Sequence, residues 1–228
     1  MNNFLKIGHR GAAGYEPENT LRSFARAIEL KCGAVEFDVR LAASGEAVVI
    51  HDSTLERTTN GQGKVCAKSL AELKTLDAGK GERIPTLEEA LDLIDGKAVA
   101  NIEIKDDEAT GSVINIIDKY VKTRGRHYGD FIVSSFNHLN LWRAKELSPG
   151  IITGALIDTL THGFADFAGE LGCCCVNTPA GCVTRQFIDE LHGKDIRVFV
   201  FTVNDPGEIK QMKALGVDGI FSDFPDRL

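Results

Sequence analysis

The stretch AVEFDVRLAASGEAVVIHD, residues 34–52, contains two apolar runs that are separated by a Ser-Gly pair at 44–45 and ends in His-Asp. Each run predicts a β-strand, and the Ser-Gly pair predicts a tight turn that joins them as a hairpin. With 44 and 45 as the two turn residues, Asp38 faces His51 across the hairpin. The hairpin therefore rises from the end of the first strand and brings His51 back beside Asp38.

On both sides of this stretch, short β-type runs alternate with segments of helical periodicity. Strands are expected at 5–8, 34–39, 100–105, 131–136, 152–157, 174–179, 197–203 and 218–224. Helices are expected at 20–31, 87–94, 113–122, 139–147, 164–171, 184–191 and 206–215, with Thr86 and Gly216 as caps. This alternation predicts an α/β protein, a single (β/α)₈ TIM barrel over residues 1–228 with a short β-hairpin extension after the strand at 34–39.

A doubly wound open sheet is the alternative architecture. It usually has fewer strands and a GxGxxG fingerprint after the first one, and HRGAAG at 9–14 does not match that fingerprint. The length of 228 residues is near that of one barrel, and no linker or low-complexity tract divides the chain. One barrel domain is therefore expected.

The composition excludes some classes of partner. The formal net charge is −7, which argues against a nucleic-acid-binding protein but not against a phosphate substrate bound in a locally basic cleft. No apolar run is long enough to span a membrane, and no signal peptide is visible. None of the six cysteines forms a CxxC pair, so we expect reduced cysteines packed as small apolar side chains in a cytoplasmic protein.

Carboxylates are placed on two neighbouring strands of the expected barrel. Glu36 and Asp38 are two residues apart, so both point to one face of their strand, and Glu103 and Lys105 repeat this spacing on the next barrel strand. Polar groups at the carboxyl ends of barrel strands are typical of active sites. The three carboxylates suit a hard divalent cation, Mg²⁺ or Ca²⁺. An internal ion-pair network with Lys105 and Arg10 is the alternative interpretation.

Two histidines are expected at the same rim. His9 and Arg10 follow the strand at 5–8, and His51 ends the returning hairpin. Imidazoles beside a metal suit general acid and base catalysis because they titrate near neutral pH. Arg10 and Lys105 suit the binding of a phosphate group. The remaining histidines are expected at the surface: His127, His138, His162 and His192.

The loop after His9 and Arg10 ends in PENT at 17–20, where the next helix begins. Asn19 or Thr20 is expected to cap that helix, and Glu18 favours the positive end of its dipole. Glu18 is also placed to pair with Arg10 across the loop.

The chain resembles the glycerophosphodiester phosphodiesterase family in a series of motifs that spans nearly its whole length. In order, these are HRG (9–11), PENT (17–20), EFDV (36–39), VVIHD (48–52), LERTTNGQG (55–63), IPTLEEAL (84–91), NIEIK (101–105), SSFN (134–137), FTVND (201–205) and GIFSDFP (219–225). The resemblance implies a TIM barrel that hydrolyses small-molecule glycerophosphodiesters to glycerol 3-phosphate and an alcohol.

The resemblance also implies roles for individual residues. His9 and His51 match the acid–base pair of the family, and Arg10 and Lys105 match its phosphate contact and its active-site lysine. Its divalent-metal ligands, usually to Mg²⁺ or Ca²⁺, correspond to Glu36, Asp38 and Glu103.

The chain departs from the family in two places. Phe201 stands where members commonly have Trp, which keeps an apolar wall for the glycerol but removes an N–H donor. The loop between LDAG (76–79) and RIP (83–85) is short, which leaves the expected mouth open. The sequence leaves the head group and the oligomeric state, monomer or dimer, undecided.

Two alternative functions stay open. The first is a lysophospholipase D or sphingomyelinase-like activity of the same superfamily, which should be accompanied by a membrane-docking surface; no basic or aromatic-rich helix in the sequence offers one. The second is a non-catalytic barrel that only binds a phosphorylated ligand, against which the complete set of histidines and carboxylates argues.

Overall fold

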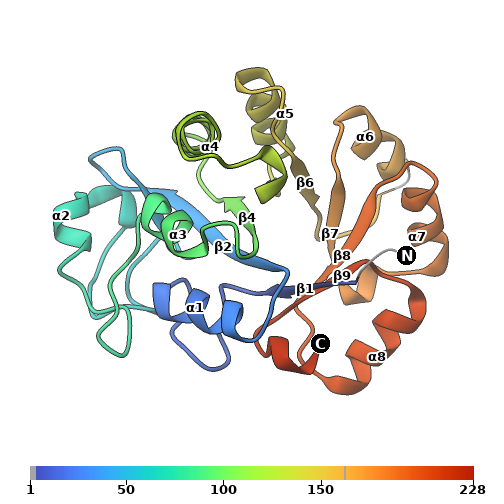
Figure 1. Ribbon diagram of the computed structural model, residues 1–228, viewed down its shortest axis with the longest axis horizontal. Coiled ribbons are helices and arrows are strands. Elements are labelled where there is room, and N and C mark those ends of the chain that lie inside the picture. Colours follow the sequence, from blue (N-terminus) through green and yellow to red (C-terminus); the bar gives the residue numbers. More distant parts are fainter. Residues whose placement is uncertain (1–3, 162) are drawn as a thin grey trace.

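The computed structural model describes residues 4–161 and 163–228, and its central feature is a closed ring of parallel strands surrounded by helices (Figure 1). The ring strands are β1 (Leu5–Gly8), β2 (Ala34–Leu41), β4 (Val99–Ile104), β5 (Phe131–Ser135), β6 (Thr153–Leu156), β7 (Cys175–Pro179), β8 (Arg197–Phe201) and β9 (Gly219–Ser222). The sheet closes because β1 pairs in parallel with both β2 and β9. The expected TIM barrel is confirmed, and the open-sheet alternative is excluded.

Helices connect successive strands of the ring. They are α1 (Leu21–Glu29), α3 (Leu87–Ile94), α4 (Ala109–Thr123), α5 (His138–Leu147), α6 (Phe164–Glu170), α7 (Arg185–His192) and α8 (Pro206–Leu215). The chain also forms short 3₁₀ turns at Val65–Ala67, Tyr128–Asp130, Ala180–Cys182 and Pro225–Arg227. No helix within the described residues is long and apolar enough to cross a membrane.

Local sequence sets several helix ends as expected. Thr86 accepts a hydrogen bond from the backbone of Glu89, whose side chain bonds back to the backbone of Thr86, and this capping box starts α3. Helix α8 ends at Gly216, which has the left-handed φ of 89° that favours glycine. Helix α4 begins earlier than expected, at Ala109 rather than at 113, and β8 ends at Phe201 rather than at 203.

The interior of the barrel changes from apolar to polar along the strands. One end is filled by a buried apolar cluster that includes Ile7, Ala34, Ile132, Cys175, Phe199 and Phe221. Two residues further along β2 lies Glu36, and two further lies Asp38, because alternate residues of a strand share a face. The carboxylates are therefore buried beyond this apolar cluster, toward the carboxyl ends of the strands. Buried charged groups at that end indicate a functional rather than a packing role.

The hairpin after β2 forms, but its register differs from the expected one. Strand β3 (Ala47–Val49) is antiparallel to β2, with Arg40 opposite Val48. Gly45 adopts φ 95° and donates its N–H to Ala42, so three residues rather than two form the turn. As a result Ile50, not His51, bonds to the backbone of Asp38, at 3.0 Å.

The extension is also larger than a hairpin. Residues after β3 include α2 (Leu70–Leu73) and build a small core of their own against the hairpin. This core contains Ala42, Val48, Ile50, Leu55, Val65, Leu73, Ala78 and Ile84. In Figure 1 this part, with α2, projects to one side of the ring. The side chains that follow His51 are therefore held by a packed unit rather than by a free loop.

Candidate active site

A cleft of 190 Å³ lies at the carboxyl ends of the barrel strands. It is lined by His9, Arg10, Glu36, His51, Glu103, Lys105, Ser134, Phe136, Leu156, Asn177, Phe201, Thr202 and Phe221. Of the residues expected at the site, only Asp38 is absent from this lining. Asp38 is buried, and it contacts the cleft residues Arg10 and Lys105. The structure thus brings every sequence-predicted site residue to one end of the barrel.

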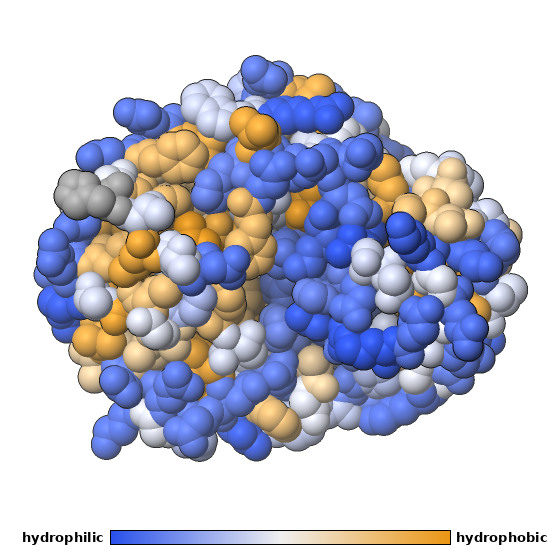
Figure 2. All heavy atoms as spheres, turned by 180° about the vertical axis from the view of Figure 1, so that it is seen from behind, coloured by the Kyte–Doolittle hydropathy of each residue, from blue (hydrophilic) through white to orange (hydrophobic). Residues whose placement is uncertain are grey.

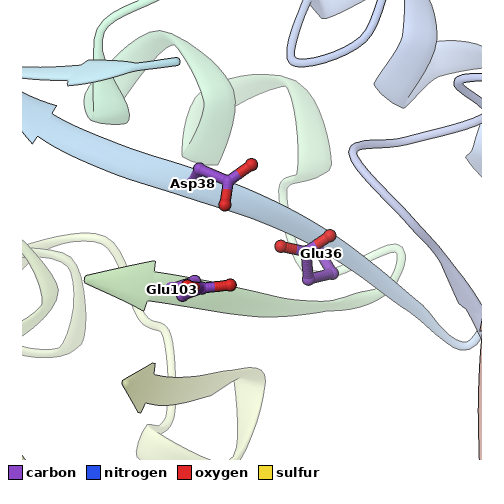
Figure 3. Close-up of side chains that lie close together, drawn as sticks. All are labelled: Glu36, Asp38 and Glu103. Carbon is purple, nitrogen blue, oxygen red and sulfur yellow. The ribbon is translucent and has the colours of Figure 1, made fainter. Parts of the chain in front are cut away.

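Glu36, Asp38 and Glu103 lie close together on β2 and β4 (Figure 3). Each offers an oxygen within 4.8 Å of the others, and their exposed fractions are 4%, 1% and 8%. Lys105 contacts Glu103 and lies 3.2 Å from Oδ1 of Asp38, while Nε of Arg10 lies 3.5 Å from Oδ2 of Asp38. Asp38 therefore has two cationic partners and Glu103 has one, so the negative charge of the three carboxylates is only partly balanced.

This charge imbalance shifts the acidities of the three carboxyl groups. Burial and the charge of Asp38 raise the pKa of Glu36 to about 8 and also raise the pKa of Glu103. Burial opposes ionisation of Asp38 too, but Lys105 and Arg10 outweigh it and lower the pKa of that group. A hard divalent cation fits this donor set, because it would supply the missing positive charge to three converging carboxylate oxygens.

His9 is held by a partner from the other end of the chain. Its Nδ1 lies 2.7 Å from Oδ1 of Asp223, and Asn204 donates to the second oxygen of Asp223 at 2.7 Å. Burial alone would lower the pKa of His9, but the hydrogen bond to Asp223 and the charge of Glu36 outweigh it and raise that pKa. The surroundings of His9 thus stabilise the protonated imidazole more than water does.

His51 is held by a chain of charged residues. Its Nδ1 lies 2.6 Å from Oδ1 of Asp52, and Arg57 bonds both oxygens of Asp52 and both oxygens of Glu18. Glu18 also accepts a 2.7 Å hydrogen bond from Arg10, which confirms the expected Arg10–Glu18 pair. Burial lowers the pKa of His51 despite the charge of Asp38 and the hydrogen bond to Asp52.

The loop between β1 and α1 owes its shape to two residues with left-handed backbone. Gly11 has φ 86°, and a Cβ at this position would collide with Ser23 of α1. Asn19 has φ 57° and donates a 2.8 Å hydrogen bond to Oδ2 of Asp38, while Thr20 alone caps α1. Of the two residues expected to cap this helix, Thr20 does so, whereas the amide of Asn19 orients a carboxylate of the site, a role that was not predicted.

An apolar wall and an unpaired amide complete the cleft. The rings of Phe201 and Phe136 meet edge to face with centroids 6.1 Å apart. Asn177 on β7 is fully buried, and neither its amide oxygen nor its amide nitrogen has a hydrogen-bond partner within the described part of the chain. The cleft thus offers an apolar surface to a ligand, and an unpaired buried amide is among its lining residues.

The histidines expected at the surface differ in their surroundings. His127 is exposed, and His192 lies 2.7 Å from Oδ2 of Asp218. The expected surface position is wrong for His138, which is half-buried and is bonded through Nε2 to the backbone of Leu156 at 2.9 Å. His162 lies outside the described residues.

Sequence reasoning missed the residues that hold the two imidazoles. Asp52 and Arg57 lie in motifs that could have been read, since Asp52 follows His51 directly and Arg57 is in LERTTNGQG. Asp223 and Asn204 gave no local sign, because Asp223 reaches His9 only when β9 closes the barrel against β1, and Asn204 acts through Asp223.

A closed parallel barrel whose polar and charged side chains gather at its carboxyl rim is typical of TIM-barrel enzymes. The chain belongs to the glycerophosphoryl diester phosphodiesterase family, whose model matches residues 9–227. A glycerophosphodiester phosphodiesterase of Caldanaerobacter subterraneus is 36% identical over 236 residues, which cover 98% of this chain and 96% of the relative. A putative glycerophosphodiester phosphodiesterase of Bacillus subtilis is 35% identical, and the matched region covers 96% of this chain and 94% of the relative.

Solved structures agree with this assignment. A phosphodiesterase of Oleispira antarctica in complex with the product sn-glycerol-3-phosphate superposes with a TM-score of 0.90 at 32% identity, over 97% of this chain and 93% of that one. A glycerophosphodiester phosphodiesterase of Thermotoga maritima gives a TM-score of 0.84 at 30% identity, over 99% and 97% of the two chains.

Proposed function

We propose that this enzyme hydrolyses glycerophosphodiesters, such as glycerophosphocholine and glycerophosphoethanolamine, to sn-glycerol 3-phosphate and an alcohol, with His9 and His51 as the acid–base pair. One observation carries the proposal: two imidazoles, each fixed through Nδ1 by an aspartate, share one cleft with Arg10 and Lys105. The family membership and the product bound to the Oleispira antarctica relative support the substrate class.

Glu36, Asp38 and Glu103 are proposed to hold a divalent cation, Mg²⁺ or Ca²⁺. The support is the donor set itself, three buried carboxylates with converging oxygens and too few cationic partners. When bound, such a cation supplies Lewis acidity and positive charge at a phosphoryl oxygen.

Arg10 and Lys105 are proposed to bind the phosphoryl group. Both side chains line the cleft and stay cationic, since neighbouring carboxylates outweigh burial and raise the pKa of each. The planar guanidinium of Arg10 can donate two parallel hydrogen bonds to phosphate oxygens, whereas Lys105 acts as a point charge. Both stabilise the negative charge that grows on the phosphoryl oxygens in the transition state.

The pKa directions of the two histidines suggest different roles. His9, whose pKa is raised, is proposed as the general acid that protonates the leaving alkoxide; His51, whose pKa is lowered, is proposed as the general base. His51 takes the proton of the nucleophile, either a water molecule or the 2-hydroxyl of the substrate, in which case a cyclic phosphate forms first. The bond from phosphorus to the alcohol oxygen breaks in both routes.

Phe201 is proposed to pack against the carbon atoms of the glycerol. It lines the cleft and contacts Phe136 and Phe221 through ring edges. The reaction is proposed to take place in the cytoplasm, which the free cysteines, three of them buried (Cys32, Cys173 and Cys175), support.

A release assay tests the proposed function. Glycerophosphocholine, -ethanolamine, -glycerol and -inositol are offered to the chelated enzyme, and sn-glycerol 3-phosphate is measured before and after addition of Mg²⁺ or Ca²⁺. We expect product only after the cation is restored. Release of no product from any diester, with either cation, would contradict the proposal and favour a barrel that only binds phosphorylated ligands.

A further inference from the structure

A second set of contacts holds His51, through its backbone rather than its ring. Arg40 lies on β2, two residues after Asp38, and its side chain is only 15% exposed. Its Nε donates a 2.8 Å hydrogen bond to the backbone carbonyl oxygen of His51. Nη1 of the same guanidinium pairs with Oδ1 of Asp106, which follows Lys105 beyond the end of β4. One arginine therefore connects the segment that carries His51 to the end of a barrel strand.

The carboxylate of Asp106 is itself fixed on the barrel. Its second oxygen, Oδ2, accepts a 3.2 Å hydrogen bond from the backbone N–H of Leu41 at the end of β2. The preceding residue, Lys105, donates its backbone N–H to the carbonyl oxygen of Val39 at 3.1 Å. Asp106 is thus bonded to two neighbouring strands, so it provides a rigid anchor for the guanidinium of Arg40.

Arg40 and Asp106 lie outside the active-site cleft. Neither is among the described residues that line it, and both line a separate depression of 320 Å³ with Leu41, Ser53, Val65, Cys66 and Glu108. Figure 2 views the molecule from behind and shows hydrophilic residues gathered beside its hollow, on the side where the extension with α2 lies in Figure 1. Arg40 therefore acts on the reaction only through the residues that it holds.

The two contacts of Arg40 require a guanidinium group. Strand β3 ends at Val49, so the carbonyl oxygen of His51 lies beyond the strand and accepts its hydrogen bond from Arg40. The bonds to His51 and to Asp106 leave from different nitrogens of one planar group. A lysine ammonium is a single point charge at the end of a flexible chain, so it cannot hold both partners in this geometry.

We propose that Arg40 is a positioning residue for the reaction, with Asp106 as its anchor: the pair fixes the backbone of His51 against the end of β4. The inference rests on the proposed function, in which His51 is the general base. The Asp52–Arg57 contacts hold the ring of His51 through Nδ1, whereas Arg40 holds its backbone. A base must keep a fixed place relative to its substrate, because displacement by about 1 Å can cost about 100-fold in rate.

Kinetics of Arg40 variants test the proposal. Arg40→Ala should lower kcat on glycerophosphocholine by about 10- to 100-fold, the range expected for a charged hydrogen bond lost from a positioning role. KM should change by less than about twofold, because Arg40 does not line the cleft. Arg40→Lys should still lose about tenfold in kcat. In the double variant with Asp106→Ala, the loss should not exceed that of Arg40→Ala alone, because the two residues act as one unit.

Two further measurements separate positioning from general destabilisation. Guanidinium ion added from solution should restore part of the kcat of Arg40→Ala, since the vacated place adjoins the open depression, and should restore none in His51→Ala. Arg185→Ala is the matched control, because Arg185 donates a 3.2 Å hydrogen bond to the backbone carbonyl of Ala214 away from the cleft. This control should keep the kcat of the unsubstituted enzyme. All rates are compared at a temperature at which circular dichroism shows each variant folded.

A readout without turnover uses the imidazole signal of His51 in the nuclear magnetic resonance spectrum of the histidine-labelled enzyme. The signal is assigned by its loss in His51→Ala. It should shift or broaden in Arg40→Ala and in the milder Arg40→Lys, and it should stay in place in Arg185→Ala.

The outcomes distinguish the proposal from its alternatives. Unchanged kcat in Arg40→Ala or Arg40→Lys overturns it, and so does a rise in KM with kcat unchanged, which would make Arg40 a substrate-binding residue. If the unsubstituted enzyme hydrolyses no diester, the proposed function fails. The imidazole signal then still decides whether Arg40 positions His51, because a signal that does not change in either Arg40 variant contradicts that role.

Discussion

His9 and Asp223 are 214 positions apart in the sequence, yet Nδ1 of His9 lies 2.7 Å from Oδ1 of Asp223. Strand β1 ends before His9 and β9 ends before Asp223, so the pairing of these two strands brings the side chains together. Asn204 holds the second carboxylate oxygen of Asp223. The contact orients the imidazole and raises the pKa of His9, which favours the protonated form that the proposed general acid requires.

The first prediction concerns the pH dependence that follows from this contact. Asp223 raises the pKa of His9, so Asp223→Asn lowers it, and a general acid with a lower pKa loses its proton at lower pH. We expect the alkaline limb of the kcat/KM profile to move down by about one to two pH units, as a charged hydrogen bond is worth about 1.5–3 kcal/mol.

The control is Asp218→Asn, which disrupts a second His–Asp pair of equal length outside the cleft. This substitution should leave the pH profile of kcat/KM unchanged, even if it lowers the free energy of unfolding. Movement of the acidic limb in Asp223→Asn, with the alkaline limb fixed, would show that His9 is the base.

The second prediction separates the two histidines by the leaving group. His9→Ala and His51→Ala should each lower kcat on glycerophosphocholine by about 10²- to 10⁴-fold. On a glycerophosphodiester with p-nitrophenol as the leaving group, His9→Ala should recover most of its activity, because that alcohol departs without protonation. His51→Ala should not recover. His127→Ala, at an exposed histidine, is the control; the reverse pattern of recovery would exchange the assigned roles.

The third prediction concerns the cation, with thermal unfolding as a readout that does not need catalysis. A divalent cation at about a hundred times its Kd stabilises the folded state by about 2.7 kcal/mol, which corresponds to a rise in Tm of about 5–10 °C for a chain of this size. Glu36→Gln and Glu103→Gln should abolish the rise. Glu88→Gln, in an exposed pair with Lys119, should retain it. An equal rise in all variants would place the cation elsewhere.

The predictable part of this molecule follows from periodicity within single strands. Alternate residues of β2 share a face, so the pairing of Glu36 with Asp38 could be read directly, and the same rule placed Glu103 and Lys105. Because all carboxyl ends of a parallel barrel meet at one rim, these pairs and His9 had to converge. The alternation of eight strands with helices could be predicted from local sequence patterns alone.

The unpredicted part depends on turns and on contacts across the barrel. One extra residue in the turn around Gly45 shifted the hairpin register by a single position. Residue propensities do not distinguish a two-residue from a three-residue turn here. The bond from Asn19 to Asp38 depends on the left-handed backbone of Asn19, which the sequence offered only as one of two candidate helix caps. Asp223 could be connected with His9 only once the closure of the sheet was known.

The final prediction tests the chain of charges that holds His51. Arg57 bonds both oxygens of Asp52 and both oxygens of Glu18, with distances from 2.6 to 2.9 Å. Lysine keeps the charge but cannot reproduce this planar fork, so Arg57→Lys should leave Asp52 and the His51 ring less well fixed. We expect kcat to fall about tenfold, with KM little changed, because charged hydrogen bonds of about 1.5–3 kcal/mol are lost from a positioning role.

Arg26→Lys is the matched control, since Arg26 forms an exposed pair with Glu29 on α1 and should tolerate the change. Arg57 is 47% exposed, so Tm should fall by no more than about 2–4 °C in Arg57→Lys. A rise in KM with kcat unchanged would instead identify Arg57 as a substrate-binding residue. Full activity in Arg57→Lys would show that Asp52 alone is enough to orient the imidazole of His51.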